Sequence, residues 1–355
     1  MNWKEKSVDI SIVCDRISST LNYDLNFFAY RIPGEKSAVF GASKNISSDL
    51  SSNGFIIAPF IEDENSSKFI IPFDYDTDIP LDVAKHKENY FLADEESTNY
   101  EEYISQANDI INYLKDNGGK IVLSRQIIVK QQINIGKTFK TLAEKYPNAF
   151  VFCFYSYLTG LWIGASPELL FSLKENEINI MSLAGTRPVG TCCSWDIKCI
   201  EEQQIVTDYI ANILSNNGLH SYISQPYNRQ AGPVEHICTD IRARFESHID
   251  VWKLIDNLSP TPALSGYPKE KAISIIKNIE KHNRRYYGGY IGIHNNSELL
   301  LYVNLRSMAY DGERCAIYVG GGYTFQSNAL DEWKETEIKS KTLIDVIENH
   351  NLNIQ

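Results

Sequence analysis

The sequence lacks long apolar segments and any excess of positive charge. Its longest apolar stretches, such as residues 55–61, are far too short to cross a bilayer, and the first six residues contain no apolar signal core. Asp and Glu outnumber Lys and Arg by 45 to 34, for a net charge of −11. We therefore expect no membrane segment, no nucleic-acid partner and a cytoplasmic location. An anionic substrate would need a local positive site.

The sequence also lacks paired cysteines, internal repeats and linker-like stretches. None of its seven cysteines lies two residues from another in a C-x-x-C pattern, and their number is odd. This usage is typical of free thiols in a reducing compartment and predicts neither a disulfide framework nor a zinc site. Without a linker, we expect one domain over residues 1–355, with a scaffold part (1 to about 100) and a motif-bearing part (115–345).

Apolar residues are plentiful: 43% of the chain is hydrophobic and 12% aromatic, which is enough for a large core. Residues 1–100 are predicted to be strand-like and irregular. Hydrophobic periodicity predicts helices at 100–117, 135–146, 198–216, 252–258 and 269–280, and a closing helix that includes 332–339. Strands are predicted at 120–129, 149–155, 162–165, 178–183, 234–237, 287–293, 299–308 and 316–319. The interleaved elements indicate an α+β fold with large, mostly antiparallel sheets.

The closing helix places Glu332, Glu335 and Lys339 on one face, because they are spaced i, i+3 and i+7. Two carboxylates beside a lysine can hold a divalent cation and an anion together. The same pattern also suits a solvated helix face with weak ion pairs. The motifs upstream favour the first interpretation.

Eight segments resemble, in the same order, motifs of the chorismate-utilising enzymes, which include anthranilate synthase component I, aminodeoxychorismate synthase, isochorismate synthase and salicylate synthase. The segments are the strand 120–125, Ser166-Pro167-Glu168, the run 183–188, His236, the run 260–268, Arg306, the glycines 320–322 and the closing Glu-Lys helix. The resemblance implies an α/β sandwich of two large sheets flanked by helices, a chorismate substrate, a bound Mg²⁺ and no obligatory protein partner.

Three positions suggest which reaction the chain performs. Family members that add ammonia have Gln where this chain has Lys120, whereas members that add water have Lys. Aminodeoxychorismate synthases typically have Lys at the position of Ala184, and salicylate synthases tend to have Thr at the position of Ala263. The Ala263-Leu264 pair looks like isochorismate synthase. Salicylate synthase and an ammonia-dependent synthase remain the alternatives, and a menaquinone or a siderophore pathway is equally compatible.

Isochorismate formation adds water at C2 of the ring while the C4 hydroxyl leaves, so it needs a base and an acid. The resemblance assigns the base to Lys120, which must be buried to be partly unprotonated near neutral pH. It assigns the acid to Glu168, whose pKa must lie well above about 4.3. Considered alone, Lys120 could equally be a solvated lysine at a strand end, and Glu168 could be a turn residue without a catalytic role.

The resemblance places the Mg²⁺ ligands at Glu202 and Glu335. Mg²⁺ prefers oxygen ligands and usually takes only one or two protein carboxylates. Relatives often have Glu-His where this chain has Glu202-Gln203, and the adjacent Glu201 is a second candidate. Glu202 is preferred because it lies four residues after Lys198, as in the family.

The remaining predicted residues contact the substrate. Arg306 and Lys339 are expected to bind its carboxylates, and the glycine backbone can approach an anion closely. The resemblance also implies that His236 lies near the leaving hydroxyl. The full substrate-binding set is Gly185, Thr186, His236, Ala263, Leu264, Tyr287, Arg306, Gly320, Gly321 and Lys339.

Overall fold

The computed structural model describes residues 6–64, 66–74, 96–246, 249–295 and 297–348. The first of two large sheets, called sheet 1, comprises β1 (Val8–Asp9), β2 (Asn26–Arg31), β3 (Ser37–Ser43), β6 (Lys120–Lys130), β7 (Phe150–Ser156), β8 (Gly160–Ser166), β14 (Gly266–Tyr267), β17 (Ser307–Tyr310) and β18 (Arg314–Tyr323). Their spatial order is β1-β3-β2-β7-β8-β17-β18-β6-β14.

Sheet 2 comprises β4 (Gly54–Ala58), β5 (Phe69–Pro72), β9 (Leu169–Lys174), β10 (Glu177–Pro188), β11 (Ser221–Ile223), β12 (Tyr227–Ala231), β13 (Val234–Arg244), β15 (Tyr290–Asn295) and β16 (Glu298–Val303). Its order is β11-β13-β10-β9-β16-β15-β4-β5, and β12 pairs with β13. The pairings between these strands in both sheets are antiparallel. The expected architecture of two large antiparallel sheets is confirmed.

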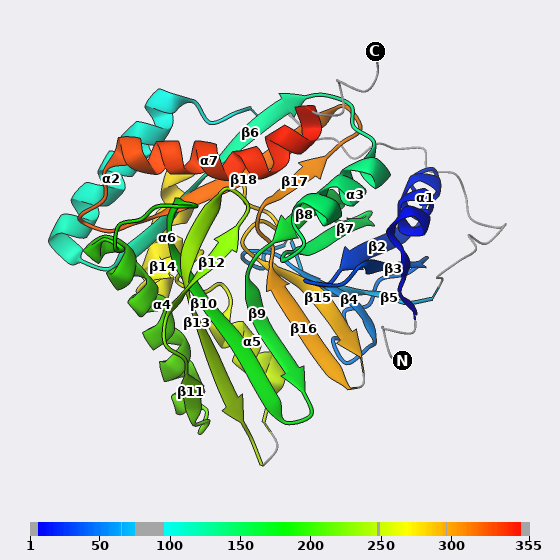
Figure 1. Ribbon diagram of the computed structural model, residues 1–355, viewed down its shortest axis with the longest axis horizontal. Helices are drawn as coiled ribbons and strands as arrows, with labels where there is room; N and C mark the ends of the chain where they lie inside the picture. The colour runs from blue at the N-terminus through cyan, green and yellow to red at the C-terminus, as the bar shows by residue number, and fades with distance from the viewer. Residues whose placement is uncertain (1–5, 65, 75–95, 247–248, 296, 349–355) are drawn as a thin grey trace.

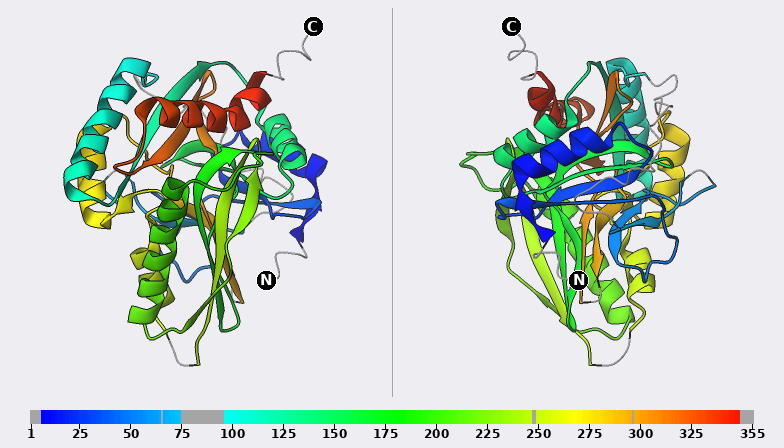
Figure 2. Two further views of the ribbon diagram at one scale, coloured as in Figure 1. Left: turned by 60° about the vertical axis from the view of Figure 1, so that its left-hand side comes forward. Right: turned by 90° about the vertical axis from the view of Figure 1, so that its right-hand side faces the viewer.

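Helices cover the outer faces of the sheets. They are α1 (Ile10–Thr20), α2 (Tyr100–Asn117), α3 (Ile135–Lys145), α4 (Ile197–Asn216), α5 (Val251–Leu258), α6 (Lys269–Ile279) and α7 (Ala329–Glu348). Apolar residues of α1, α3 and α7 pack on sheet 1, and α2 and α6 lie against β6 and its neighbours β18 and β14 at one end of the same sheet. Helix α4 packs on β10 and β13 of sheet 2, with α5 beside it. Figure 1 shows α7 crossing β18 and β6, and Figure 2 shows α4 alongside β10 and β13. No helix of the described residues has the length and apolar character needed to span a bilayer.

The space between the two sheets is filled mainly by aromatic rings. Phe150 of sheet 1 stacks on Tyr302 of sheet 2 with ring centroids 4.3 Å apart. Strand β2 explains how one strand serves two cores: Phe27 and Ala29 join the helix-covered core, while Phe28 and Tyr30 join the aromatic core. Successive side chains of a strand point to opposite faces, so an unbroken apolar run satisfies both.

Two sequence-based predictions were wrong in part. Residues 1–100 were expected to be strand-like and irregular, and β1 to β5 lie there, but residues 10–20 form helix α1, which buries Val13, Ile17 and Thr20 at helical spacing. The segment 299–308 was expected to be one strand, but it is divided between β16 in sheet 2 and β17 in sheet 1. The break falls at Arg306, whose φ of +49° is incompatible with a continuous strand.

Candidate active site

Two short connections carry the chain from one sheet to the other, and they lie side by side. Pro167 and Glu168 lead from β8 to β9, and residues 304–306 lead from β16 back to β17. Since β8 pairs with β17 and β9 with β16, the two crossings are neighbours. The Val303 N–H donates to the Glu168 carbonyl (3.1 Å), and the Ala165 N–H donates to the Arg306 carbonyl (3.1 Å). The acid and the arginine predicted from sequence therefore sit together where the sheets meet.

A cavity opens beside these crossings, and it collects residues from both sheets, α4 and α7. Nearly all of the predicted site residues line it: Glu168, Gly185, Thr186, Glu202, His236, Ala263, Leu264, Tyr287, Arg306, Gly320, Gly321, Glu335 and Lys339. Lys120 is the exception: it does not line the cavity, but its buried side chain contacts Glu202, which does. The sequence-based set of site residues thus forms one cluster.

Glu168 is almost completely buried, and its Oε1 atom has no hydrogen-bond partner. Burial raises the pKa of Glu168 to about 8, although the positive charges of Lys120 and Arg229 act to lower it. The carboxyl group therefore carries its proton at neutral pH, as a proton donor must. The expectation of a pKa well above the ordinary value agrees with this environment.

Lys120 begins β6 and is fully buried. Its Nζ atom lies 2.9 Å from Glu202 Oε1 but makes no hydrogen bond of good geometry within the described residues. Gly322 of β18 allows this contact, because a Cβ there would lie 2.0 Å from Glu202 Oε1 and 2.8 Å from Lys120 Cε. A buried amino group without a well-aligned hydrogen bond is available to a new partner.

Arg306 is buried without a carboxylate partner among the described residues. Its Nη1 atom donates to Thr342 Oγ1 (3.0 Å), and its Nη2 atom lies 3.5 Å from His236 Nε2. Because the Gly185 carbonyl can only accept, His236 Nδ1 carries the proton in their 2.8 Å contact, which leaves Nε2 to accept from Arg306. Burial, together with Arg306 and Lys339, lowers the pKa of His236 to about 3, so the ring is neutral. A buried arginine that forms no ion pair among the described residues is a binding site for an anion.

Three carboxylates lie close together beside the cavity: those of Glu202, Glu332 and Glu335. Glu335 forms an ion pair with Lys339 (2.6 Å), and Glu332 pairs with Lys198. The Oε2 atom of Glu332 is buried without a partner, and burial raises the pKa of Glu332 to about 7. The pKa of Glu335 is instead lowered, because Lys339 and Lys198 outweigh the effect of its burial.

The donor set of these carboxylates fits a hard divalent cation. Gly321 and Gly322 leave room there: a Cβ at residue 321 would lie 2.9 Å from Glu332 Oε2, and one at 322 would overlap Glu202. The described part of the chain has no group of three or more His, Cys, Asp or Glu side chains placed to hold a metal ion. A cation bound here would therefore use one or two protein carboxylates and complete its shell with other oxygens, as Mg²⁺ commonly does.

Sequence reasoning omitted several residues that shape the site. Lys198 holds Glu332 and lies one helical turn before Glu202 on α4, a spacing that was visible in the sequence. Arg229 on β12 acts electrostatically on Glu168, and Tyr318 of β18 lines the cavity and stacks on Tyr287 at 5.6 Å. No local motif marks these two residues, because the pairing of β12 with β13 and of β18 with β6 sets their positions.

The sequence matches a known family over most of its length. A sequence model of the family described as "Chorismate binding enzyme" matches residues 77–348. The isochorismate synthase MenF of Bacillus subtilis is 27% identical over 280 residues, which are 74% of this chain and 59% of that protein. The isochorismate synthase EntC of Escherichia coli K12 is 27% identical over 247 residues, which are 65% and 63% of the two chains. Anthranilate synthase component 1 of Acinetobacter calcoaceticus is 23% identical over 294 residues, 77% and 58% of the two chains.

The matched region spans less than two thirds of the length of each of these relatives. Two solved structures superpose on this chain over a larger share of both chains. A 2,3-dihydroxybenzoate-specific isochorismate synthase from Bacillus anthracis superposes with a TM-score of 0.76 at 22% identity, covering 95% of this chain and 99% of that one. The menaquinone-specific isochorismate synthase MenF of Escherichia coli gives a TM-score of 0.76 at 16% identity, covering 95% and 91%. These likenesses establish the fold.

Proposed function

The chain belongs to the chorismate binding enzyme family, and on that premise we propose that it is an isochorismate synthase, an isomerase that converts chorismate to isochorismate. The observation that carries the proposal is the position of a protonated carboxyl group, Glu168, next to an unpaired buried arginine, Arg306, with Lys120 nearby. An anion held by Arg306 would bring its ring within reach of an acid. The isomerisation requires that arrangement.

Each group then has a distinct task. Arg306 and Lys339 hold the substrate carboxylates, since a guanidinium can bind a carboxylate by two parallel hydrogen bonds. His236 keeps Arg306 in place through its neutral Nε2 atom. Lys120 takes a proton from the water that attacks C2, and Glu168 donates its proton to the departing C4 hydroxyl. The two carry complementary charges after the step, and a proton exchange with solvent resets them.

Glu202 and Glu335 would hold a Mg²⁺ ion near the ring carboxylate, with Glu332 beside them. The ion supplies Lewis acidity, which draws negative charge away from the ring and favours loss of the hydroxyl. Lys198 holds Glu332 in place by its ion pair and acts against the rise in pKa that burial causes. Lys339 holds Glu335 in place by an ion pair. It also donates to the Gly320 carbonyl at 2.9 Å, which fixes α7 against β18.

Water is favoured over ammonia as the nucleophile because a buried lysine occupies position 120, against Glu202. Ala263 and Leu264 line the cavity and present only apolar groups, which favours a reaction that stops at isochorismate over one that continues to salicylate. We infer that chorismate and Mg²⁺ suffice and that no protein partner is required.

The product formed from chorismate tests the proposal. Purified protein with chorismate and Mg²⁺ is expected to form isochorismate, resolved by chromatography, and a chelator should stop the reaction until Mg²⁺ is restored. Salicylate together with pyruvate as the main products would contradict the proposal in favour of a salicylate synthase. An aminated product that appears only with added ammonia would indicate an ammonia-dependent synthase. Tight binding of chorismate without turnover would indicate a non-catalytic relative.

Substitution of Gly322 by Ala is expected to lower turnover by about 100-fold, because it misplaces the Lys120–Glu202 pair. The new Cβ would lie 2.0 Å from Glu202 Oε1, which is the end of a mobile side chain rather than backbone. We therefore expect the fold to be retained. Thermal melting and initial rates measured together check this, and a variant that melts normally with a rate within threefold of the original would refute the importance of this contact.

A further inference from the structure

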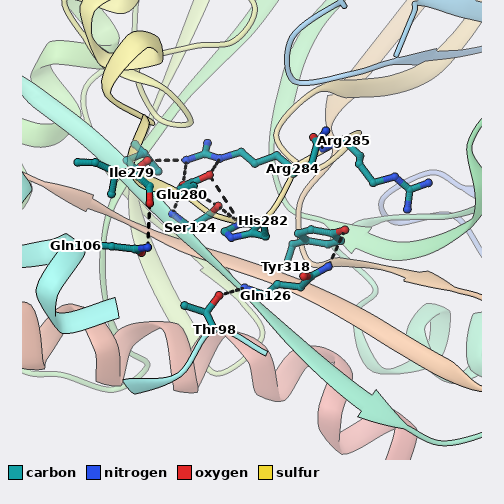
Figure 3. Close-up of polar contacts among 12 residues, drawn as sticks. Thr98, Gln106, Ser124, Gln126, Ile279, Glu280, His282, Arg284, Arg285 and Tyr318 are labelled. Atoms are coloured by element: carbon teal, nitrogen blue, oxygen red, sulfur yellow. Dashed lines mark hydrogen bonds and ion pairs between the residues drawn. The ribbon is translucent and has the colours of Figure 1, made fainter. Parts of the chain in front are cut away.

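A buried ion pair lies on the far side of β6 from α7, outside the cavity. Arg284 Nη2 donates to Glu280 Oε1 at 2.5 Å and Arg284 Nε donates to Glu280 Oε2 at 2.8 Å, so the contact is two-pronged. Both side chains are 3% exposed. Figure 3 shows the pair between the end of α6 and β6. None of the roles assigned above to site residues uses these two side chains.

The pair grips the strand that carries Lys120. Arg284 Nη2 also donates to the Val122 carbonyl (2.6 Å), and Glu280 Oε1 accepts from the Ser124 N–H (2.7 Å) and hydroxyl (2.9 Å). Alternate residues of a strand share a face, so Lys120, Val122 and Ser124 point the same way. Val122 itself lines the cavity. The ion pair therefore binds the backbone edge of β6 at Val122 and Ser124, and the Ser124 hydroxyl that it also binds lies on the face that presents Lys120.

The same guanidinium holds a second wall of the cavity. Arg284 Nη1 donates to the carbonyl of Leu264, at 2.8 Å, and Leu264 lines the cavity next to Ala263. Two residues further on, Gly266 and Tyr267 pair with Ile121 and Lys120 of β6. The Arg284 carbonyl accepts from the N–H of Tyr287, a further lining residue. Two segments of the site thus bind the side chain of Arg284, and a third binds its backbone carbonyl.

Lysine could not replace this arginine. Four acceptor contacts diverge from one planar guanidinium, and the planar, five-donor geometry of arginine can reach them simultaneously, whereas an ammonium is a point charge. Glu280 remains ionised in this position: burial acts to raise its pKa, but Arg284 and the Ser124 N–H lower it below the ordinary value. The network is satisfied within itself and leaves no need for solvent.

We propose that Glu280 and Arg284 are positioning residues that fix the Lys120 strand against the Ala263-Leu264 loop. The inference rests on the proposed function, because it assigns the purpose of the pair to the placement of Lys120. It requires neither residue to touch the substrate. A misplacement of about 1 Å between reacting groups can lower a rate by about 100-fold, which sets the size of the expected effect.

A matched control is available elsewhere in the fold. Arg31 is also buried and donates to the backbone carbonyls of Pro147 (2.6 Å), Tyr146 (2.6 Å) and Ala149 (3.1 Å), none of which lines the candidate active site. Arg284→Lys and Arg31→Lys both replace a buried guanidinium that donates hydrogen bonds to backbone carbonyls. If burial and hydrogen bonding alone matter, the two variants should behave alike.

The test compares the kcat and KM of both variants well below their melting temperatures. Arg284→Lys is expected to lower kcat by about 100-fold with KM within threefold, whereas Arg31→Lys should lower only the melting temperature. In Arg284→Ala, guanidinium at millimolar concentration is expected to restore part of the rate. It can enter because Glu280, His282 and Arg284 also line a second cavity, which shares no lining residue with the candidate active site. An Arg284→Lys variant that is folded and as active as Arg31→Lys would overturn the inference.

A second measurement does not depend on turnover. With ¹³C-labelled lysine, the Cε signal of Lys120, assigned by its loss in Lys120→Arg, should shift in Arg284→Lys and stay unchanged in Arg31→Lys. An unchanged signal in both would refute the positioning role, whatever product the protein forms. If the signal shifts in Arg284→Lys but the unsubstituted protein does not convert chorismate, the positioning role is upheld and the proposed function is refuted.

Discussion

Replacement of Glu168 by Gln is expected to abolish detectable isomerisation, with kcat lower by roughly 10²- to 10⁴-fold, the usual contribution of a positioned general acid. Glutamine has the same shape and is neutral, as the protonated carboxyl is, so the buried site should accept it without loss of stability. Chorismate affinity should remain, since Arg306 and Lys339 are untouched. Initial rates, binding by calorimetry and thermal melting distinguish these effects. A Gln variant with normal turnover would exclude Glu168 as the acid.

The pH dependence provides an independent check of the same group. Burial raises the pKa of Glu168 from 4.5 to about 8, so the protonated, active form is lost as the pH rises through about 8, and kcat/KM should fall there. The stability that this carboxyl contributes is present in full below about pH 4.5 and is lost between 4.5 and 8, because unfolding releases the proton in that interval. The Glu168→Gln variant should lack this part of the pH dependence of stability.

Replacement of Lys120 by Met should lower kcat by a similar factor of roughly 10²- to 10⁴-fold, because it removes the base while keeping most of the side-chain volume. The substitution also leaves the largely buried Glu202 without the ammonium 2.9 Å away, so some loss of stability is expected as well. Rates must therefore be compared at temperatures where both proteins are folded.

Lys269→Met is a suitable control for the loss of a partly buried lysine. Burial lowers the pKa of Lys269 to about 8, and its ammonium donates to the carbonyls of Asn257 and Ser259, outside the site. We expect this variant to keep its kcat. If both variants lose the same fraction of activity, the effect of Lys120→Met reflects general destabilisation, and the assignment of Lys120 as base fails.

Much of the fold could be read from local patterns. The helix predicted at 100–117 has those bounds in the structure, because Asn99 caps its start and Gly118, at φ +64°, ends it. The strand starting at Lys120 and the closing helix were equally clear. The division of 299–308 was not, because its apolar residues continue through β16 and the signal for the break is the backbone conformation of Arg306.

The site residues were found by family resemblance, whereas their environments depend on the fold. The sequence places Glu168 among apolar neighbours but does not show that its Oε1 is left without a partner. It shows the i, i+4 spacing of Lys198 and Glu202, yet Lys198 pairs with Glu332 and Glu202 with Lys120. Such exchanges of partner between elements distant in sequence are set by tertiary packing and have no local signal.

The connections that carry Glu168 and Arg306 both bind the ligand and join the two sheets, so ligand binding and the packing of the sheets depend on the same residues. Each side chain stands on a connection that runs from one sheet to the other: the Glu168 carbonyl binds sheet 2 and the Arg306 carbonyl binds sheet 1. An anion held between the two side chains would therefore join the two halves of the sandwich. A bound ligand stabilises only the state that binds it, here the fully docked sandwich. Protection by chorismate should therefore extend to the outermost strands of both sheets, and neither half of the chain alone can retain the pocket.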